Sequence, residues 1–226
     1  MCSSDLRFGR GIYFPEEGQM EPRDLLPALG DALHARGVTW HEGTRVRQVA
    51  PGAVHTDTGT HRFDLVADTR GLGARPHHPL RGVRGEVMRF HAPDVGLRRM
   101  VRLMHPRYPL YIVPRPDDVY LIGATTIESD ADGPVTVRSA LELLSAVYSL
   151  HPGFAEAAVL SQEVGCRPAY ADNLPRIRYE PGLLSVNGLY RHGFLISPAL
   201  AREACNLVSG GAPRHPEICE VAHAAT

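Results

Sequence analysis

Apolar residues recur every three or four positions in three stretches of the chain, and this period predicts three helices. In "RDLLPALGDALHARG" an apolar stripe covers residues 25–33, with Asp24 as the expected cap and Gly37 as the stop. In "SPALAREACNLVSGG" Ser197 is the expected cap and Gly210 the stop. In "TVRSALELLSAVYSL" the expected buried face consists of Leu141, Leu144, Val147 and Tyr148.

Alternation of apolar and polar residues predicts strands between these helices. Three short pieces, "VTWHEGTRVRQVAP", "AVHTDTG" and "FDLVADT", are separated by glycine turns and indicate a small antiparallel excursion that ends in a buried strand. Residues 84–126 contain longer alternating segments, among them "GEVMRFHA", "PLYIVPR" and "VYLIGAT", with a turn at "RPDD". This stretch predicts an antiparallel sheet. The order of elements favours one α/β module interrupted by another.

Composition excludes several classes of function. The formal net charge is -1, so the chain lacks the basic field that nucleic acid requires. All 24 cationic residues are arginine, and without lysine a pyridoxal Schiff base, a Walker phosphate loop and a lysine nucleophile are excluded. Four cysteines without a CxxC pair indicate reduced thiols of a cytoplasmic protein. No apolar run is long enough to predict a membrane helix.

Three polar residues in apolar surroundings are candidates for a binding site. Arg167 precedes a proline that stiffens its backbone, which suits bidentate recognition of a small carboxylate. An internal ion pair with an acid such as Asp172 is the favoured alternative. Tyr111 would donate to an acid or belong to the core, and Arg115 after it indicates a turn or the surface. Arg191 in "GLYRHGFLISP" is expected to be buried, where it would cap carbonyls or pair with a glutamate, or lie over a ligand. The flanking glycines, which let a ligand approach the backbone, favour the ligand.

Other motifs carry less weight. His215, Cys219 and His223 have a spacing seen in zinc sites, but a solvated polar tail is favoured, so no metal site is predicted. His77 and His78 are adjacent, would point apart and indicate a loop. "RGLGARP" lacks the third glycine of a dinucleotide loop, and no complete phosphate-binding glycine loop is present. GxSxG is also missing, which argues against covalent hydrolysis.

Taken in order, "GQMEPRDLLPAL", "DTRGLGARP", "RGVRGEVMRF", "YPLYIVPR", "YLIGATTIES", "GCRPAYADNLP" and "GLYRHGFLISPALA" resemble the glycine oxidases of thiamine biosynthesis, within the flavin-dependent D-amino-acid oxidase family. The resemblance covers about residues 8–211. It implies an FAD-binding domain of the glutathione-reductase type, interrupted by an antiparallel-sheet substrate domain with helices. The implied boundaries are 1–78 for the first part of the FAD-binding domain, 79–168 for the substrate domain, 169–211 for the returning part and 212–226 for a loose tail.

The resemblance also implies roles for individual residues. Arg167 matches the arginine that holds the substrate carboxylate, Tyr111 the tyrosine that assists it, and Arg191 a second arginine over the flavin ring. Val46 matches a position where the backbone meets the adenine side of FAD. The segment whose backbone lies against the isoalloxazine corresponds to Leu189, Tyr190, Arg191, His192, Gly193, Phe194 and Leu195.

The activity implied is FAD-dependent oxidation of glycine or another small amino acid to an imine, with molecular oxygen reduced to peroxide. Sarcosine or small D-amino acids satisfy the same clamp, and Pro109 stands where some glycine oxidases carry a histidine near the substrate. The family's opening GxGxxG loop is missing, so the chain is expected to be a C-terminal portion. The alternative is a non-catalytic fragment that cannot hold FAD. The sequence leaves a homo-oligomer open.

Overall fold

The computed structural model describes residues 10–104 and 109–222, and the chain divides into two compact units. Unit 1 comprises Met1–Thr39, Arg84–Ile127 and Asp132–Gly165. Unit 2 comprises Trp40–Val83, Glu128–Ala131 and Cys166–Thr226. Each unit is therefore assembled from stretches that lie far apart in the sequence. The domain boundaries implied at residues 78, 168 and 211 stay predictions.

The core of unit 1 is a six-stranded sheet in the order β10-β5-β8-β7-β6, with β9 paired to β5. The pairings of β5 with β8, β8 with β7 and β7 with β6 are antiparallel, which confirms the antiparallel sheet expected over residues 84–126. Asp117 and Asp118, at φ 59° and 54°, form the turn between β7 and β8. The strands are β5 (Arg81–His91), β6 (Val101–Leu103), β7 (Leu110–Pro114), β8 (Val119–Gly123), β9 (Ile127–Glu128) and β10 (Ala158–Ala169).

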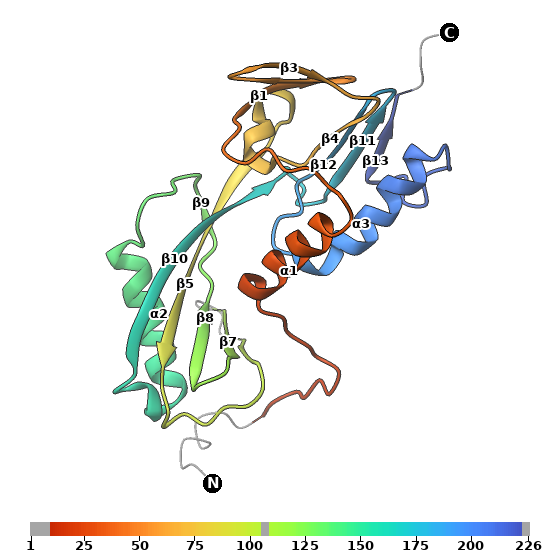
Figure 1. The fold of residues 1–226 in the computed structure, drawn as a ribbon. Coiled ribbons are helices and arrows are strands. Elements are labelled where there is room, and N and C mark those ends of the chain that lie inside the picture. The colour runs from red at the N-terminus through yellow and green to blue at the C-terminus, as the bar shows by residue number, and fades with distance from the viewer. Residues whose placement is uncertain (1–9, 105–108, 223–226) are drawn as a thin grey trace. The chain divides into compact units, whose positions relative to one another are not determined.

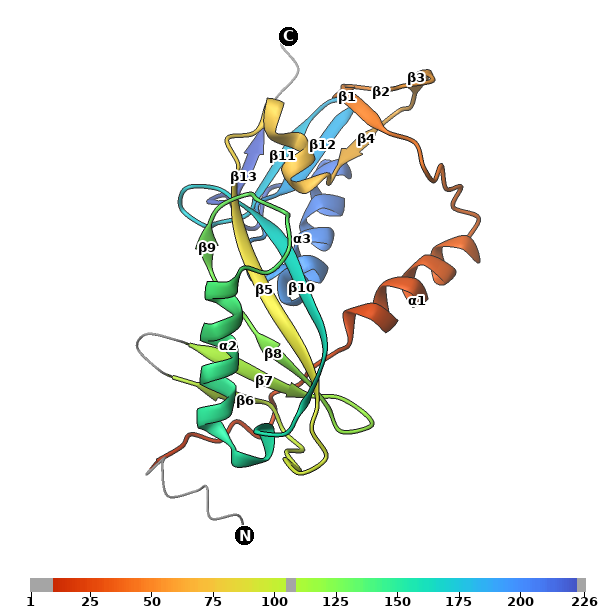
Figure 2. The ribbon, with the colours of Figure 1, turned by 90° about the vertical axis from the view of Figure 1, so that its left-hand side faces the viewer.

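Helix α2 (Val137–Leu150) packs along this sheet, as Figure 2 shows. Thr136 caps it by accepting a hydrogen bond from the amide of Ser139. The helix was expected, but its predicted buried face was wrong in part, because Leu141 and Tyr148 are 59% and 63% exposed. The side chains that pack against the sheet core include Leu143, Ala146 and Val147, together with the short helix η3 (Pro152–Phe154).

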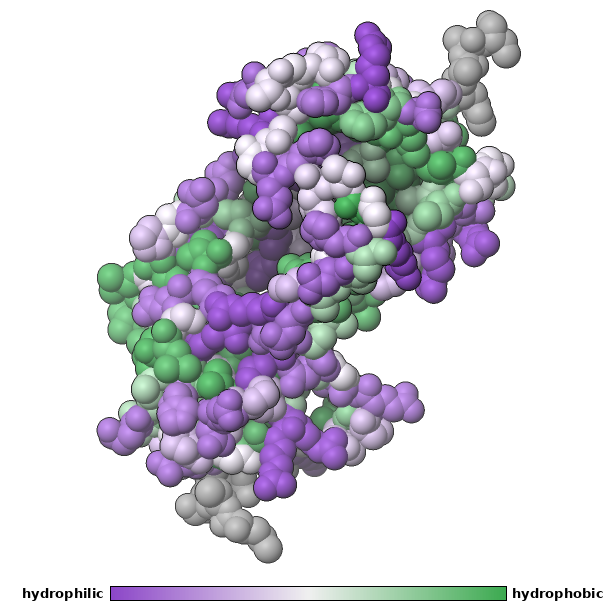
Figure 3. Space-filling view, in the orientation of Figure 1, coloured by the Kyte–Doolittle hydropathy of each residue, from purple (hydrophilic) through white to green (hydrophobic). Residues whose placement is uncertain are grey.

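Helix α1 (Pro22–His34) confirms the first predicted helix. Its cap is Glu21, whose carboxylate accepts from the amide of Arg23, and Asp24 lies in the first turn instead. None of the helix residues, all of which are described, is buried. The predicted apolar stripe is thus exposed, with Leu26 at 57% and Leu29 at 51%. The face drawn in Figure 3 is hydrophilic over much of its area, with separate hydrophobic areas among the hydrophilic residues.

Unit 2 contains a four-stranded sheet in the order β13-β11-β12-β4, with helix α3 along one side (Figure 1). Its pairs β11–β13 and β12–β4 are parallel, whereas β11–β12 is antiparallel. Ile177 and Leu184 of this sheet pack on Leu200, Ala204 and Leu207 of α3. The elements are β4 (Val66–Asp68), β11 (Arg176–Glu180), β12 (Leu183–Asn187), β13 (Cys219–Val221) and α3 (Gly193–Val208).

Two predictions about the C-terminal region were wrong. α3 begins at Gly193, four residues before the predicted cap, so Ser197 lies inside the helix, where its hydroxyl donates to the carbonyl of Gly193 at 2.5 Å. The stretch 212–226 was expected to be a loose tail. Within it β13 pairs with β11, because the amide of Ile177 donates to the carbonyl of Ile218 at 2.8 Å.

The remaining elements of unit 2 follow the predicted antiparallel excursion. β1 (Val46–Ala50), β2 (Ala53–Thr56) and β3 (Gly59–Arg62) form a three-stranded antiparallel sheet, and β4 follows them with Val66 and Asp68 buried. The "RGLGARP" stretch forms the 3-10 helix η2 (Gly71–His77) after β4. No helix among the described residues is long and apolar enough to cross a membrane.

Candidate functional site

Arg167 lies near the end of β10 and is half-buried. The residue that follows it, Pro168, accepts a hydrogen bond from the amide of Tyr190 at 3.1 Å. This bond joins the segment that carries Arg167 to the loop that was predicted to meet the flavin. Asp172, the expected alternative partner of Arg167, pairs with Arg176 and accepts a hydrogen bond from the amide of Leu174 at 3.0 Å.

The loop between β12 and α3 has a strained backbone. Gly188 adopts φ 76°, and Tyr190 adopts φ 49°, a left-handed conformation that non-glycine residues adopt infrequently. A Cβ at position 188 would lie 2.3 Å from Cδ2 of Tyr170, so glycine is required both by conformation and by space. Arg191 was expected to be buried, but it is exposed, as is His192. The guanidinium is thus solvated and available to a ligand.

The N-terminus of α3 presents backbone donors. His192 occupies the cap position, and no side chain among the described residues caps the helix there. The amides of Gly193, Phe194 and Leu195 belong to the first turn, where an α-helix offers no acceptor of its own. Phe194 and Leu195 are 47% and 80% exposed. The segment can therefore donate hydrogen bonds to carbonyl oxygens of a ligand beside apolar surface.

Tyr111 and Val46 lie elsewhere in the structure. Tyr111 is half-buried on β7 of unit 1 and stands opposite Gly123 of β8. A Cβ at Gly123 would lie 3.0 Å from the Tyr111 hydroxyl, so this glycine leaves the space that the phenol occupies. Val46 begins β1 of unit 2 and pairs with Thr56. The structure thus joins Arg167 to the Leu189–Leu195 loop within unit 2, while Tyr111 belongs to unit 1.

A buried polar cluster around His78 in unit 2 was missed by the sequence analysis. His78 is 7% exposed, and its Nδ1 lies 3.0 Å from the hydroxyl of Tyr170 and 3.0 Å from Nη1 of Arg178. Its Nε2 lies 3.0 Å from Oγ of Ser185, which is 5% exposed. His77 is exposed and His78 buried, but both line the same cavity, and His77 ends the 3-10 helix η2 instead of lying in the predicted loop. The signal in the sequence was Tyr170, a large polar residue inside the "CRPAYADNLP" motif.

The hydrogen bonds fix the tautomer of His78. A guanidinium can donate but not accept, so Nδ1 must be the acceptor and Nε2 carries the proton that Ser185 accepts. Burial and the nearby charge of Arg178 lower the pKa of His78. Burial also raises the pKa of Tyr170, which keeps its phenol protonated as a donor. His78 is therefore a neutral acceptor at neutral pH.

His78, Arg178 and Ser185 line a cavity of about 510 Å³ in unit 2. Its floor is one row of residues that stand directly opposite each other across the four-stranded sheet: Glu220, Arg178, Ser185 and Asp68. Nε of Arg178 lies 2.7 Å from Glu220, and Nη2 of Arg70 lies 2.8 Å from Asp68. Both carboxylates thus have cationic partners.

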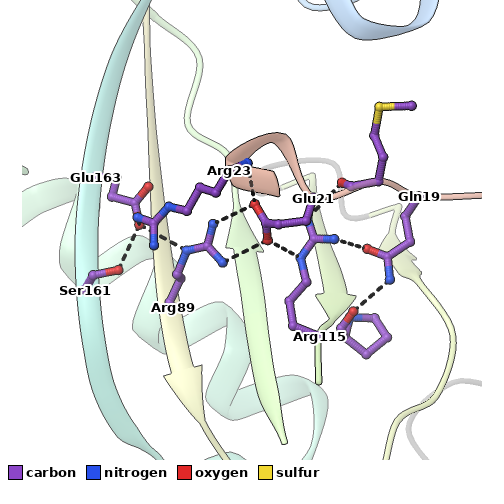
Figure 4. Close-up of polar contacts among 9 residues, drawn as sticks. Gln19, Glu21, Arg23, Arg89, Arg115, Ser161 and Glu163 are labelled. Atoms are coloured by element: carbon purple, nitrogen blue, oxygen red, sulfur yellow. Dashed lines mark hydrogen bonds and ion pairs between the residues drawn. The ribbon is translucent and has the colours of Figure 1, made fainter. Parts of the chain in front are cut away.

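A second polar cluster lies in unit 1, at the N-terminus of α1 (Figure 4). Glu21 lies between two arginines, 3.2 Å from Nη1 of Arg89 and 2.9 Å from Nε of Arg115. Burial by itself would raise the pKa of Glu21, but the hydrogen bonds from Arg89 and from the amide of Arg23, with the charge of Arg115, outweigh it and lower that pKa. Arg115 was predicted at a turn or the surface; it does begin the turn after β7, where its amide donates to the carbonyl of Val119, but its side chain is only 9% exposed.

The other side chains drawn in Figure 4 extend this cluster along β10. Nη2 of Arg23 lies 2.6 Å from Glu163, which also accepts from Nε of Arg89 at 3.1 Å. Gln19 donates to the carbonyl of Pro114 at 2.9 Å. The cluster therefore fixes the N-terminus of α1 to the sheet of unit 1, and its carboxylates are already neutralised by arginines.

Unit 1 also contains a buried ion pair. Arg84 and Glu86 are 4% and 0% exposed, and Nε and Nη2 of Arg84 donate to Glu86 at 2.8 and 2.6 Å. Nη2 also donates to the carbonyl of Pro134. Desolvation would raise the pKa of Glu86, but hydrogen bonds from Ser139 and Arg84 lower it. The two buried charges are thus compensated within unit 1, as buried ions must be, and carry no ligand proposal.

The spacing of His215, Cys219 and His223 was weighed as a metal site. His223 lies outside the described residues. Among the residues that the structure describes, no group of three or more histidine, cysteine or acidic side chains is placed to hold a metal ion. Cys166, Cys205 and Cys219 are free thiols.

Comparison with known proteins gives consistent results. The model of the FAD dependent oxidoreductase family, DAO, matches residues 2–207. A putative thiamine biosynthesis oxidoreductase ThiO of Rhizobium etli is 47% identical over 198 residues, which are 87% of this chain and 57% of that protein. The glycine oxidase of Geobacillus kaustophilus is 32% identical over 211 residues, 87% of this chain and 55% of that protein.

The folds agree as well. The crystal structure of the Geobacillus kaustophilus glycine oxidase superposes with a TM-score of 0.80 at 29% identity, over 94% of this chain and 61% of that one. The mixed α/β fold is thus that of a glycine oxidase. The chain spans a little over half the length of these curated relatives.

Proposed function

The chain belongs to the FAD dependent oxidoreductase family DAO. From this premise we propose that its two units carry the substrate-binding residues and the flavin-ring segment of an amino-acid oxidase. The proposed substrate is glycine or another small amino acid. The identity of 47% to a putative thiamine biosynthesis oxidoreductase supports a role in making thiamine. The observation that carries the proposal is the bond between Tyr190 and Pro168, because it joins the Arg167 segment to the uncapped N-terminus of α3.

The segment from Leu189 to Leu195 fits one edge of a flavin. Its first-turn amides are donors without an intrahelical acceptor, and the carbonyl oxygens of an isoalloxazine are acceptors. The positive end of the helix dipole favours negative charge on that ring. Exposed apolar side chains at Phe194 and Leu195 offer contact area for a flat aromatic group. Val46, on β1, is proposed to meet the adenine end of FAD.

FAD, when bound, supplies the two-electron oxidation, and the residues of this chain hold and orient the amino acid. Arg167 would form two parallel hydrogen bonds to the substrate carboxylate, since its guanidinium is planar and always charged. Tyr111 would donate its phenolic proton to the same carboxylate, and Arg191 would add a second positive charge. Fixing the carboxylate orients the α-carbon, which lowers the entropic part of the barrier. Molecular oxygen is the proposed electron acceptor.

The flavin half of the proposal is tested with FAD and with lumiflavin, which has the ring alone. We expect both to bind the purified chain and to change their absorption spectra, because the proposed contacts are made to the ring. His192→Asp places a carboxylate at the cap of α3, where it accepts from the same amides. This variant should stabilise the helix by about 0.5–2 kcal/mol and yet weaken flavin binding.

The opposite signs of these two effects separate competition for the amides from unfolding. Ser209→Asp adds the same charge at the other end of α3 and should leave flavin binding unchanged. A chain that elutes colourless after incubation with either flavin would refute the proposed flavin site. Peroxide release from glycine, sarcosine and D-proline then ranks the substrates.

A further inference from the structure

Tyr170 connects two parts of the proposed site, although it was assigned no role there. It lies three residues after Arg167, is 5% exposed and directs its hydroxyl to Nδ1 of His78 at 3.0 Å. Its ring lies so close to Gly188 that a Cβ there would come within 2.3 and 2.5 Å of two ring carbons. Tyr170 thus contacts the start of the loop whose next residues are proposed to meet the flavin.

A backbone hydrogen bond also connects the Arg167 segment to the loop. Tyr190 donates its amide to the carbonyl of Pro168, one residue after Arg167. Asn187, 2% exposed, accepts from the amide of Gly188 at 2.8 Å and donates to the carbonyl of Gly71 at 3.0 Å. The loop is therefore fixed at its start, and its left-handed residue, Tyr190, is held by the segment that carries Arg167.

His78 fixes the position of the Tyr170 ring in turn. Its Nε2 proton is accepted by Ser185 in the middle of the four-stranded sheet, and its Nδ1 accepts from Tyr170 and Arg178. The guanidinium carbons of Arg176 and Arg178 also lie 5.5 and 5.9 Å from the centroid of the Tyr170 ring. The sheet thus fixes the position of the Tyr170 ring through His78, and the ring in turn fixes Gly188 at the start of the loop.

We propose that Tyr170, held by His78 and Ser185, is a positioning residue that keeps Arg167 in register with the loop Leu189–Leu195. The effect on substrate binding rests on the proposed function. The link between Tyr170 and the loop depends only on the contacts described above. In this proposal the buried phenol of Tyr170 sets the distance between Arg167, which would hold the carboxylate, and the loop that would face the flavin ring.

The test measures hydrogen exchange at the Tyr190 amide and binding of acetate, a carboxylate with no amine to oxidise, to the chain incubated with FAD. Tyr170→Phe keeps the ring and loses the bond to His78. We expect exchange at Tyr190 to become at least tenfold faster and acetate binding to weaken about tenfold, while the urea midpoint stays close to that of the wild type. Tyr179→Phe removes the hydroxyl of a tyrosine in strand β11 that packs on the core of unit 2; it is the matched control and should change neither value.

A second pair of variants avoids any doubt about folding. Ser185→Ala removes the acceptor for His78 and should reproduce both effects. Ser185→Thr retains the hydroxyl, and its added methyl group has room in the adjoining cavity of about 510 Å³, so it should restore wild-type behaviour. If Ser185→Ala and Ser185→Thr behave alike, the hydroxyl has no positioning role and the inference is wrong.

The two proposals fail in different ways. Unchanged exchange at Tyr190 in both Tyr170→Phe and Ser185→Ala would overturn the positioning role, even if acetate binds through Arg167. Faster exchange at Tyr190 with no acetate binding by the wild type would support the coupling and refute the proposed substrate site. Retained acetate affinity in both variants, together with weakened binding in Arg167→Ala, would leave the substrate site standing and overturn the positioning role.

Discussion

At the residue scale, some positions of unit 2 accept only one kind of side chain because of the residues around them. Gly188 is such a position, because it combines a left-handed backbone with direct contact to the Tyr170 ring. His78 is another such position, because the guanidinium of Arg178 can only donate, so Nδ1 of His78 must be an acceptor. Each property leads to a measurable consequence.

Gly188→Ala should lower the free energy of unfolding by more than Gly210→Ala. Both glycines have positive φ, 76° and 80°, so both variants carry the conformational cost of about 1 kcal/mol. Only at position 188 does a Cβ also meet a ring, which should add about 1–3 kcal/mol of overpacking, since nothing lies within 4 Å of the Cβ at position 210. Urea unfolding measures the difference. Equal losses in the two variants would show that the ring does not pack against Gly188.

The stability of unit 2 should fall as the pH drops below about 6.5, the ordinary pKa of histidine. Burial and Arg178 lower the pKa of His78 in the folded state, so the unfolded chain binds more protons in this window. Tyr170, Asp68, Glu220 and His77 also face the ring or adjoin it. The slope should approach 1.4 kcal/mol per pH unit and level off below the folded pKa of His78.

Unfolding measured between pH 7.5 and 5 checks this, and the window lies above the range in which the lowered carboxyl pKa values of Glu21 and Asp68 take effect. His78→Asn should lose the slope, whereas His77→Gln, which changes the exposed neighbour, should keep it. A wild-type curve that is flat from pH 7.5 to 5 would contradict the buried neutral histidine.

At the element scale, the sequence predicted which segments are helices and strands better than it predicted how they are oriented. The three helices and the antiparallel sheet of unit 1 were correct, because their hydrophobic periods are local properties of the chain. The caps of α1 and α3 were misplaced by a few residues. Glu21 serves as cap, and its carboxylate is held by Arg89 of β5 and by Arg115 after β7, which are distant in the sequence and which no local pattern indicates.

Helix α2 provides a test of the corrected face. Leu143 is 4% exposed and belongs to the core of unit 1, so Leu143→Ala should lower the free energy of unfolding by about 2–5 kcal/mol. Leu141, two residues earlier and 59% exposed, should lose no more than about 0.5 kcal/mol in Leu141→Ala. The same urea titration measures both. The reverse order would restore the face that the sequence pattern first suggested.

At the scale of the whole molecule, the parts that sequence reasoning could not supply are contacts between distant residues. Ser185 and His78 are 107 positions apart, and Tyr170 and His78 are 92 apart, so their hydrogen bonds leave no trace in the spacing of motifs. Arg191 was expected to be buried because its neighbours are apolar, yet the loop turns it outward. The roles of Arg167, Tyr111 and Val46 stay predictions.

The family and the fold were predicted correctly, since the resemblance rested on seven segments in order and not on any single motif. Unit 2 contains Arg167, the proposed substrate arginine, and the N-terminus of α3, which no described side chain caps; a backbone hydrogen bond joins the two segments. The proposal concerns the part of the relatives' length that this chain covers, 57% of the putative ThiO of Rhizobium etli.

The most direct test of the central claim is the change in the flavin absorption spectrum when acetate is added to the chain incubated with FAD. The account predicts a saturable shift in the wild type, lost in Arg167→Ala and kept in Arg202→Ala, which removes an exposed arginine of α3. An identical shift in Arg167→Ala, or no protein-bound flavin spectrum at all, would contradict it.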